Sequence, residues 1–471
     1  QTIACPDCGP QLVWQGRPDA ASAQAGDDPL AMAVQAIQSS QVIAVKATGG
    51  YHLACRADQE QAVQVCRSIK QRDRKPFAVL FASLEMLADY ASYSEAESDL
   101  LCSQARPIVL LDDLKSSTLA RAVAMQSPCL GAMLPATPIQ KLLAEACGPL
   151  VMTSANRSDD LLLYRDDDLG DFVRQAEDIA GVLTFRRDIL QGLDDSVVRW
   201  QGRAQFIRRA RGFVPLAVDL GQMHDATTAG DPLILALGGD LKATAAWSKS
   251  GFAWLTQPAG DLASLEVQAA WQENLDHLQH LLGWPAGGAP GLICQDQHPG
   301  YFSQALFKDR WPDIPRISIQ HHHAHVASVL AEHQLQEPVL GIAFDGTGYG
   351  ADGTIWGGEF LLCTGPEYQR LAHFKPTFLP GGDTAMRDAW RSLAGYLEAA
   401  GLPNPAANPA QDPAVDRARS ERLTLVRQAL RAGINGLANS SVGRLFDAVC
   451  ALLELSDVNH FEGECGSLLE A

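Results

Sequence analysis

Short apolar runs alternate with amphipathic stretches along the first half of the chain. Several runs have the length and residue types of buried strands, and they span residues 41–46, 77–80, 108–111, 150–153 and 181–185. Between them, helical periodicity predicts amphipathic helices over residues 30–39, 61–71 and 139–146. This alternation predicts a mixed α/β domain that ends near Pro215.

A polar segment at residues 221–231, with Gly, Thr and Asp, is the best predicted domain boundary. A β-rich run follows at 232–240, and a second strand at 339–344 leads into a Gly-rich turn. A chain of 471 residues is too long for one core. We therefore predict an α/β multidomain protein with a first domain at residues 30–218 and a second at residues 232–471.

Composition and charge narrow the classes of function. The chain is 46% hydrophobic and 20% charged, as in soluble globular proteins, and no apolar run reaches the roughly 18 residues of a membrane span. Its formal net charge of −18 argues against DNA as a partner and makes RNA unfavoured. Most of the 11 cysteines stand alone, which is typical of a reducing compartment, so a cytoplasmic location is expected.

Cys5 and Cys8 differ from the other cysteines, because their C-x-x-C spacing supplies half of a tetrahedral zinc site. A redox pair or two ordinary thiols is the alternative. The Gly-Pro after Cys8 favours a zinc knuckle, so residues 1–20 are interpreted as the remnant of a zinc-finger region that holds a structural zinc in the full-length protein. Both ends of the sequence are interpreted as cuts within a longer protein.

A dense group of basic residues marks the first candidate site. Lys46 ends a predicted strand and precedes two glycines and His52, an arrangement that lets the backbone approach an anion. Lys70, Arg72 and Lys75 belong to a run with five basic residues in nine. A solvated helix face is the usual fate of such a run and is the alternative.

Polar groups later in this half favour an anion site. Small hydroxyl and amide groups at a strand end can contact phosphate or ribose, and Arg forks match phosphate oxygens. The residues concerned are Thr153, Ser154, Asn156, Asp195, Ser196 and Arg208. No Walker-type G-x-x-x-x-G-K-[ST] is present, so a P-loop is not the nucleotide site.

The first half resembles the YrdC-like domain over roughly residues 30–215, because it contains, in order, K-x-x-G-G-x-H, K-x-R-x-x-K-P, T-S-A-N and D-D-S-V. That family condenses ATP with carbamate or a bicarbonate-derived group to form an acyl-adenylate. The resemblance implies catalytic roles for Lys46, His52, Lys70, Arg72 and Lys75. It also implies a nucleotide cleft lined by Thr153, Ser154, Asn156, Asp195, Ser196 and Arg208.

Four of the chain's 12 histidines fall within residues 321–325. His321 and His325 are four apart, so a helix would place both imidazoles on one face, where they could bind a metal. A polar surface patch or one buried structural histidine is the alternative. His322 and His323 are interpreted as supporting groups rather than as ligands.

A strand-terminal Asp followed by a Gly-rich hairpin, at residues 345–350, matches the phosphate loop of actin- and Hsp70-like ATPases. Further motifs rich in Gly, Asp and Arg follow at 381–387 and 443–447. With the His motif they resemble the TsaD-like domain. The resemblance implies an actin/Hsp70-like α/β fold from about residue 232 to the end.

The same resemblance implies a metal, zinc or iron, held by His321, His325 and Asp345, with a further Asp ligand beyond Ala471. It implies that ATP with its Mg²⁺, or carbamoyl-adenylate, lies between the Gly-rich loops. The implied nucleotide-binding residues of this half are Asp345, Gly346, Thr347, Gly348, Gly381, Gly382, Asp383, Arg387, Gly443 and Asp447, the last of them at the ribose.

A zinc knuckle, a YrdC-like domain and a TsaD-like domain in this order resemble the HypF family of hydrogenase-maturation carbamoyltransferases. The resemblance implies that carbamate from carbamoyl phosphate reacts with ATP, and that the carbamoyl group passes to the C-terminal cysteine of the partner HypE. One alternative is an O-carbamoyltransferase of natural-product biosynthesis, in which the domain order is reversed. Another is a non-catalytic metal- and RNA-binding protein, against which the net charge argues.

Overall fold

The structure, a computed structural model, describes residues 9–17, 28–115, 118–157, 160–221, 231–285, 287–406, 408, 410–434 and 436–471. Cys5 and Cys8, with the predicted zinc knuckle, lie outside these residues. The chain forms two compact units. The first comprises Gln1–Ala217, Gly239–Ala246 and Trp254–Gly288, and the second comprises Val218–Gly238, Trp247–Ala253 and Ala289–Ala471. The domain limits 30–218 and 232–471 remain predictions.

A ten-stranded mixed sheet forms the centre of the first unit, in the order β1-β8-β2-β3-β7-β4-β6-β5-β9-β10. Its strands are β1 Leu12–Gly16, β2 Val42–Lys46, β3 Tyr51–Arg56, β4 Ala78–Leu80, β5 Ile108–Leu111, β6 Leu130–Met133, β7 Leu150–Ser154, β8 Ile179–Phe185, β9 Val197–Trp200 and β10 Ala204–Arg208. The helices are α1 Pro29–Gln38, α2 Glu60–Lys70, α3 Leu84–Leu87, α4 Glu95–Cys102, α5 Arg121–Ala124, α6 Pro138–Cys147, α7 Asp166–Gln175 and α8 Leu265–Leu281. The strands and helices predicted for this half are therefore present, with ends shifted by at most about two residues, as is usual for element boundaries.

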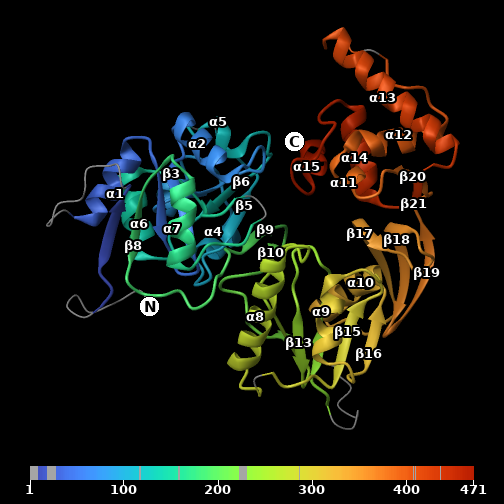
Figure 1. Ribbon diagram of the computed structural model, residues 1–471, viewed down its shortest axis with the longest axis horizontal. Coiled ribbons are helices and arrows are strands. Elements are labelled where there is room, and N and C mark those ends of the chain that lie inside the picture. The colour runs from blue at the N-terminus through green and yellow to red at the C-terminus, as the bar shows by residue number, and fades with distance from the viewer. Residues whose placement is uncertain are drawn as a thin grey trace. The chain divides into compact units, whose positions relative to one another are not determined.

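Helices cover both faces of this sheet (Figure 1). Side chains alternate along β3, so Leu53 and Ala54 enter different core clusters. Val63 of α2 packs with Leu53, whereas Ile37 of α1 and Leu143 of α6 pack with Ala54. Burial on both faces explains why the strands appear in the sequence as continuous apolar runs rather than as alternating ones.

Two further sheets occupy mainly the second unit. The six-stranded sheet has the order β11-β14-β13-β12-β15-β16, and the other has β17-β18-β21-β20 with β19 paired to β18. The strands are β11 Val218–Asp219, β12 Ile234–Ala236, β13 Ala246–Lys249, β14 Phe252–Leu255, β15 Leu292–Asp296, β16 Arg316–Ile319, β17 Val339–Tyr349, β18 Ile355–Thr364, β19 Glu367–His373, β20 Thr377–Pro380 and β21 Gly436–Asn439.

The helices of the second unit pack partly on these sheets and partly on one another (Figure 1). They are α9 Phe302–Arg310, α10 His321–Glu332, α11 Thr384–Arg387, α12 Ala389–Ala400, α13 Pro413–Arg431, α14 Val442–Leu452 and α15 Glu464–Glu470. Contacts of α12 and α14 with β20 and β17 cover one side of the five-stranded sheet. Within the described ranges, no helix combines the length and the apolar composition that crossing a membrane requires.

The Gly-rich hairpin predicted after Phe344 is present, as antiparallel β17 and β18, but its turn comes later than predicted. Strand β17 continues to Tyr349, and its register against β18 shifts between Phe344 and Gly348. Asp345, Gly346 and Thr347 together lie opposite the single residue Gly357 and form an irregularity inside the strand. The chain turns back only after this segment, where the amide of Gly350 bonds the carbonyl of Thr354.

Two helical glycines provide a matched test of packing. At Gly395 in α12 a Cβ atom would lie 2.3 Å from the carbonyl oxygen of Phe378 in β20, whereas at Gly170 in α7 the nearest atom would be an Arg174 nitrogen at 3.5 Å. We expect Gly395→Ala to destabilise by about 1–3 kcal/mol through overpacking. Gly170→Ala should stabilise by roughly 0.5–1 kcal/mol, because alanine is the better helix former. Hydrogen exchange in each helix measures both effects, and greater protection of α12 in Gly395→Ala would contradict the close contact.

Candidate functional site

Lys70, the last residue of α2, is buried with 2% of its surface exposed. Its Nζ donates to the carbonyl of Ser154 at 2.5 Å and to the carbonyl and the Oδ1 of Asn156, both at 2.9 Å. Thr153 is buried beside Ser154 in β7. Among the described residues no carboxylate forms an ion pair with this ammonium group. Burial and then repulsion by Arg72 lower the pKa of Lys70 to about 7. A buried cation held only by uncharged oxygens is suited to an anionic ligand.

The loop after α2 takes its shape from Arg67, which the sequence analysis did not assign to the site. The buried Arg67 guanidinium donates to the main-chain carbonyls of Arg72, Asp73, Lys75 and Ala122, at 3.0, 3.3, 3.2 and 2.7 Å. Arg72 donates in turn from Nε to the carbonyl of Lys75 at 2.9 Å. The charges of Arg72 and Lys75 both contribute to the lowered pKa of Lys70, so the three cations act on one region.

His52 and Asp195 form a buried pair beside this region. His52 pairs with Ser154 in the β3–β7 register, and its Nε2 lies 3.6 Å from the Asp195 Oδ2. Burial lowers the pKa of His52. Burial raises the pKa of Asp195, but the charges of His52 and Arg211 outweigh burial and hold it below its ordinary value. The Arg211 Nη2 lies 2.6 Å from Asp195 Oδ1, and Arg208 donates to the main-chain carbonyl of Asp195 at 2.8 Å.

The structure leaves two predicted residues outside this cluster. The Lys46 Nζ lies 2.6 Å from Asp166 Oδ1, and the hydroxyl of Tyr51 donates to the same oxygen at 2.7 Å. No contact between described residues joins Lys46 to Lys70. Ser196 is fully buried, and its hydroxyl donates to the carbonyl of Arg211 at 3.0 Å and accepts from the N–H of Ala210 at 2.8 Å, so its nucleotide contact remains a prediction. Neither arrangement could be predicted from motif spacing.

The second candidate site lies at the start of α10. His321 and His325 are one turn apart, with ring centroids 4.8 Å apart and Nε2 atoms 3.2 Å apart. The Asp345 Oδ2 lies 3.2 Å from the His321 Nε2 and 3.7 Å from the His325 Nε2. These residues can each offer one ligand atom, all within 4.8 Å of one another. Two imidazoles and a carboxylate at such distances suit a divalent cation.

Asp296 is a residue to which the sequence analysis gave no role. Its Oδ2 accepts from the His321 Nδ1 at 2.7 Å. Strands β15 and β16 are parallel, and Asp296 is paired with Ile319, so their carboxyl ends meet at one edge of the sheet. Because α10 starts directly after β16, this edge brings Asp296 to His321. An Asp at a strand end, before His-Pro-Gly-Tyr, was the available signal.

The electrostatics of this site fit a cation. Burial lowers the pKa of His321, but hydrogen bonds to Asp296 and Asp345 outweigh burial and raise it to about 9. Burial raises the pKa of Asp345, but the neighbouring imidazoles of His321 and His322 outweigh burial and hold it far below its ordinary range. Asp345 Oδ2 is buried and has no geometrically sound hydrogen bond among the described residues, although imidazole nitrogens surround it. A carboxylate oxygen in that setting is one that a metal would satisfy.

Two of the predicted Gly motifs meet at this site. A Cβ atom at Gly348 would lie 2.5 Å from a ring carbon of His322, so a side chain there would displace the imidazole. At Gly443 a Cβ atom would lie 2.8 Å from the Cα of Gly346, which brings the start of α14 against β17. The hydroxyl of Ser441 donates to the carbonyl of Gly346 at 2.6 Å and strengthens that contact.

Asn459 links the remaining predicted motifs. Its side-chain amide donates to the carbonyl of Met386 at 3.1 Å and to Asp447 Oδ1 at 2.9 Å, and its backbone N–H donates to the carbonyl of Arg387 at 2.7 Å. Asp447 is buried, which raises its pKa, and Arg444 lies 2.9 Å from its Oδ2. Through these hydrogen bonds Asn459 joins α14 to the segment 381–387, which includes α11. This segment contains the predicted residues Gly381, Gly382, Asp383 and Arg387. A ribose contact of Asp447 remains a prediction.

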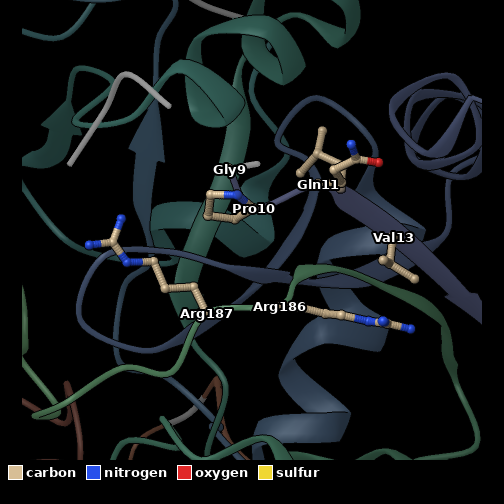
Figure 2. Close-up of a pocket in the computed structure, with 7 residues that line it drawn as sticks. Gly9, Pro10, Gln11, Val13, Arg186 and Arg187 are labelled. Atoms are coloured by element: carbon tan, nitrogen blue, oxygen red, sulfur yellow. The ribbon is translucent and has the colours of Figure 1, made fainter. Parts of the chain in front are cut away.

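A cavity of about 640 Å³ lies elsewhere in the first unit, beside β1 and the end of β8 (Figure 2). It is lined by Gly9, Pro10, Gln11, Leu12, Val13, Arg186 and Arg187. Figure 2 shows the side chains of Arg186 and Arg187 extending away from each other, so they do not converge on one anion. None of the residues around Lys70 lines this cavity, and it is not part of the candidate site.

Three protein-family profiles match successive parts of the chain. Residues 35–210 match the Sua5/YciO/YrdC family, described as telomere recombination. Residues 229–332 match the HypF Kae1-like domain, and residues 341–471 match the second subdomain of the carbamoyltransferase Kae1-like domain. The predicted succession of a YrdC-like and a TsaD-like fold is thereby confirmed.

Curated relatives match along nearly the whole chain. Carbamoyltransferase HypF2 of Cupriavidus necator is 39% identical over 468 residues, which are 94% of this chain and 55% of that protein. Carbamoyltransferase HypF of Synechocystis is 36% identical over 98% of this chain and 60% of that protein. The HypF of Rhodobacter capsulatus is 37% identical, with coverage of 100% and 61%. The chain thus spans 55–61% of the length of these relatives.

Two solved structures share the fold at substantial identity. Full-length HypF in its phosphate- and nucleotide-bound form is 35% identical with a TM-score of 0.87, and the match covers 100% of this chain and 59% of that one. HypF of T. kodakarensis is 32% identical with a TM-score of 0.88, covering 99% and 60%. Profiles, relatives and structures agree, and the chain belongs to the HypF family of carbamoyltransferases.

Proposed function

We propose that the first unit joins carbamate and ATP to carbamoyl-adenylate, and that the second transfers the carbamoyl group to the C-terminal cysteine of the partner HypE. The observation that carries the proposal is the buried Lys70 ammonium, which only uncharged oxygens contact within the described structure. Membership of a carbamoyltransferase family supports it, as does the phosphate and nucleotide bound in a related HypF. Carbamate would come from carbamoyl phosphate.

In the first step, an oxygen of carbamate attacks the α-phosphorus of ATP, and the bond from that phosphorus to pyrophosphate breaks. Two anions must approach each other, so the barrier is largely electrostatic. Lys70, Arg72 and Lys75 offset the repulsion, and the buried position of Lys70 strengthens its attraction for phosphate oxygens. Ser154 and Asn156 hold the ammonium in place. The His52–Asp195 pair borders the same pocket.

In the second step, the cysteine thiolate attacks the carbonyl carbon, a C–S bond forms, and the C–O bond to AMP breaks. His321, His325 and Asp345 would hold a divalent cation, zinc or iron. Such a cation supplies a Lewis acid for carbamoyl and phosphate oxygens when it is bound. Asp296 holds the imidazole of His321 so that its Nε2 faces the ligand group.

Exchange of labelled pyrophosphate into ATP tests the first step. We expect exchange when the chain receives carbamoyl phosphate, or ammonium bicarbonate as a direct source of carbamate, and none without them. Transfer of labelled carbamoyl to a HypE peptide ending in cysteine tests the second step, and a serine-ended peptide is the control. Tight RNA binding without pyrophosphate exchange would contradict the proposal and favour the non-catalytic alternative.

The lowered pKa of Lys70 predicts a pH dependence of ATP affinity. Phosphate binds the ammonium form, and this form is lost as pH rises through about 7. We expect affinity to fall by up to about tenfold per pH unit above that point, with proton uptake on binding. Lys70→Arg should abolish this slope, because guanidinium does not titrate in this range. Isothermal titration in buffers of different ionisation enthalpy measures both quantities.

Two further variants make the Lys70 test specific. Lys70→Gln should reduce pyrophosphate exchange on the order of 10²-fold, the usual loss when a preorganised donor to a developing anion is removed. Lys141→Arg is the matched control, because Lys141 is a half-buried residue of the same unit paired with Glu145. An unchanged pH slope in Lys70→Arg would show that another group controls binding.

Asp296→Asn tests the metal site. The amide cannot accept the Nδ1 proton of His321 as strongly as a carboxylate does, so Nε2 becomes a weaker and less well-oriented ligand. We expect Zn²⁺ affinity, measured by chelator competition, to fall roughly 10- to 100-fold. Asp313→Asn, at an exposed aspartate, is the control. Equal Zn²⁺ affinities in the two variants would show that Asp296 does not support metal binding.

A further inference from the structure

The side chain of Gln320 can be oriented from main-chain chemistry alone. Gln320 precedes α10 as its N-cap and is buried with 2% of its surface exposed. Its Oε1 accepts from the backbone N–H of His323 at 2.9 Å, and its Nε2 donates to the backbone carbonyl of Tyr349 at 3.1 Å. A backbone N–H only donates and a backbone carbonyl only accepts, so one orientation of the amide satisfies both.

This orientation determines which nitrogen of His322 carries the proton. The His322 Nδ1 lies 3.2 Å from the Gln320 Nε2, and since that nitrogen is a donor, Nδ1 must accept. The proton of the neutral ring is therefore on Nε2. His322 is fully buried, and its Nε2 faces the Asp345 Oδ2 at 3.5 Å, although neither atom forms a hydrogen bond within the described residues.

The neighbouring His321 has the opposite arrangement. Its Nδ1 lies 2.7 Å from a carboxylate oxygen of Asp296, which can only accept, so the Nδ1 carries the proton. The His321 Nε2 lies 3.2 Å from Asp345, and it offers a lone pair to a metal once its proton is displaced. The two adjacent histidines thus differ, because a metal can displace the Nε2 proton of His321 while the Nδ1 keeps its own, whereas the neutral ring of His322 has its one proton on Nε2.

We propose that Gln320 is a positioning residue that sets the proton of His322 on Nε2, so that His322 turns an N–H toward the Asp345 carboxylate and stays out of the coordination sphere. This inference rests on the metal site of the proposed function. It separates the roles within His321–His325, in which ring position alone would allow His322 to compete as a ligand. The amide of Gln320 blocks Nδ1 of His322, and the proton blocks Nε2.

The orientation of the Asp345 carboxylate depends on neighbouring groups because of its position in β17. It belongs to the irregular segment of β17, where the register with β18 shifts, and its Oδ1 accepts from the N–H of Gly346 at 2.6 Å. Oδ2 remains for the metal and must face both His321 and His325. An N–H on the His322 Nε2 would attract Oδ2 from 3.5 Å, and Gly348 leaves the room that the ring needs.

Gln320→Glu tests the proposal with little change in size. One carboxylate oxygen can still accept from His323, but the other accepts where the amide donated, so His322 should move its proton to Nδ1. Two-bond ¹H–¹⁵N spectra of the metal-free protein, labelled at histidine, distinguish the tautomers. We expect an Nε2–H ring at His322 in the wild type and an Nδ1–H ring in the variant, with Zn²⁺ affinity lower by roughly 10- to 100-fold.

Gln428→Glu, an exposed change of the same chemistry in α13, is the matched control and should alter neither the spectrum nor the affinity. An Nδ1–H ring at His322 in the wild type would overturn the proposal, and this measurement stands even where Gln320→Glu does not fold. An unchanged Zn²⁺ affinity in a folded Gln320→Glu with a switched tautomer would also overturn it. A wild type with the expected tautomer but no Zn²⁺ or Fe²⁺ binding would instead refute the metal site of the proposed function.

Discussion

Burying the ammonium of Lys70 and the carboxylate of Asp345 costs free energy, and the surroundings of these two charges define the candidate sites. Oxygens without charge hold Lys70, so its positive charge is available to a ligand. Imidazole nitrogens surround Asp345, so its negative charge and their lone pairs are available to a cation. Within the described residues, one unit thus presents a cation without a paired carboxylate, and the other presents a candidate set of metal ligands.

Residues to which the sequence analysis assigned no role position both charged groups. Arg67 donates to three carbonyls of the basic loop and to that of Ala122, and so keeps Arg72 and Lys75 close to Lys70. In the second unit, Asp296 and Gln320 set the protons of the two neighbouring imidazoles. These supporting residues act through rigid hydrogen bonds, and such bonds are what keep catalytic and metal-binding groups within the narrow geometry their chemistry needs.

Much of the fold and of the candidate site could be predicted because it depends on local chemistry. Buried strands appear as apolar runs, and the i, i+4 spacing of His321 and His325 places both rings on one helix face whatever the helix packs against. The resemblance to YrdC-like and TsaD-like domains also predicted the order of these two domains along the chain, and the family matches confirm that order. The turn predicted directly after Phe344 comes only after Tyr349, because pairing with β18 carries β17 through the Gly-rich segment.

The sequence by itself determined which segments become strands and helices, where basic residues concentrate and which histidines share a helix face, because these properties depend on neighbours a few residues away. Only the tertiary structure decided that Lys46 pairs with Asp166 instead of joining Lys70, and that Asp296 reaches His321 across two parallel strands. Such contacts join residues far apart in the chain, and strand order, register and burial select them. No local pattern contains that information.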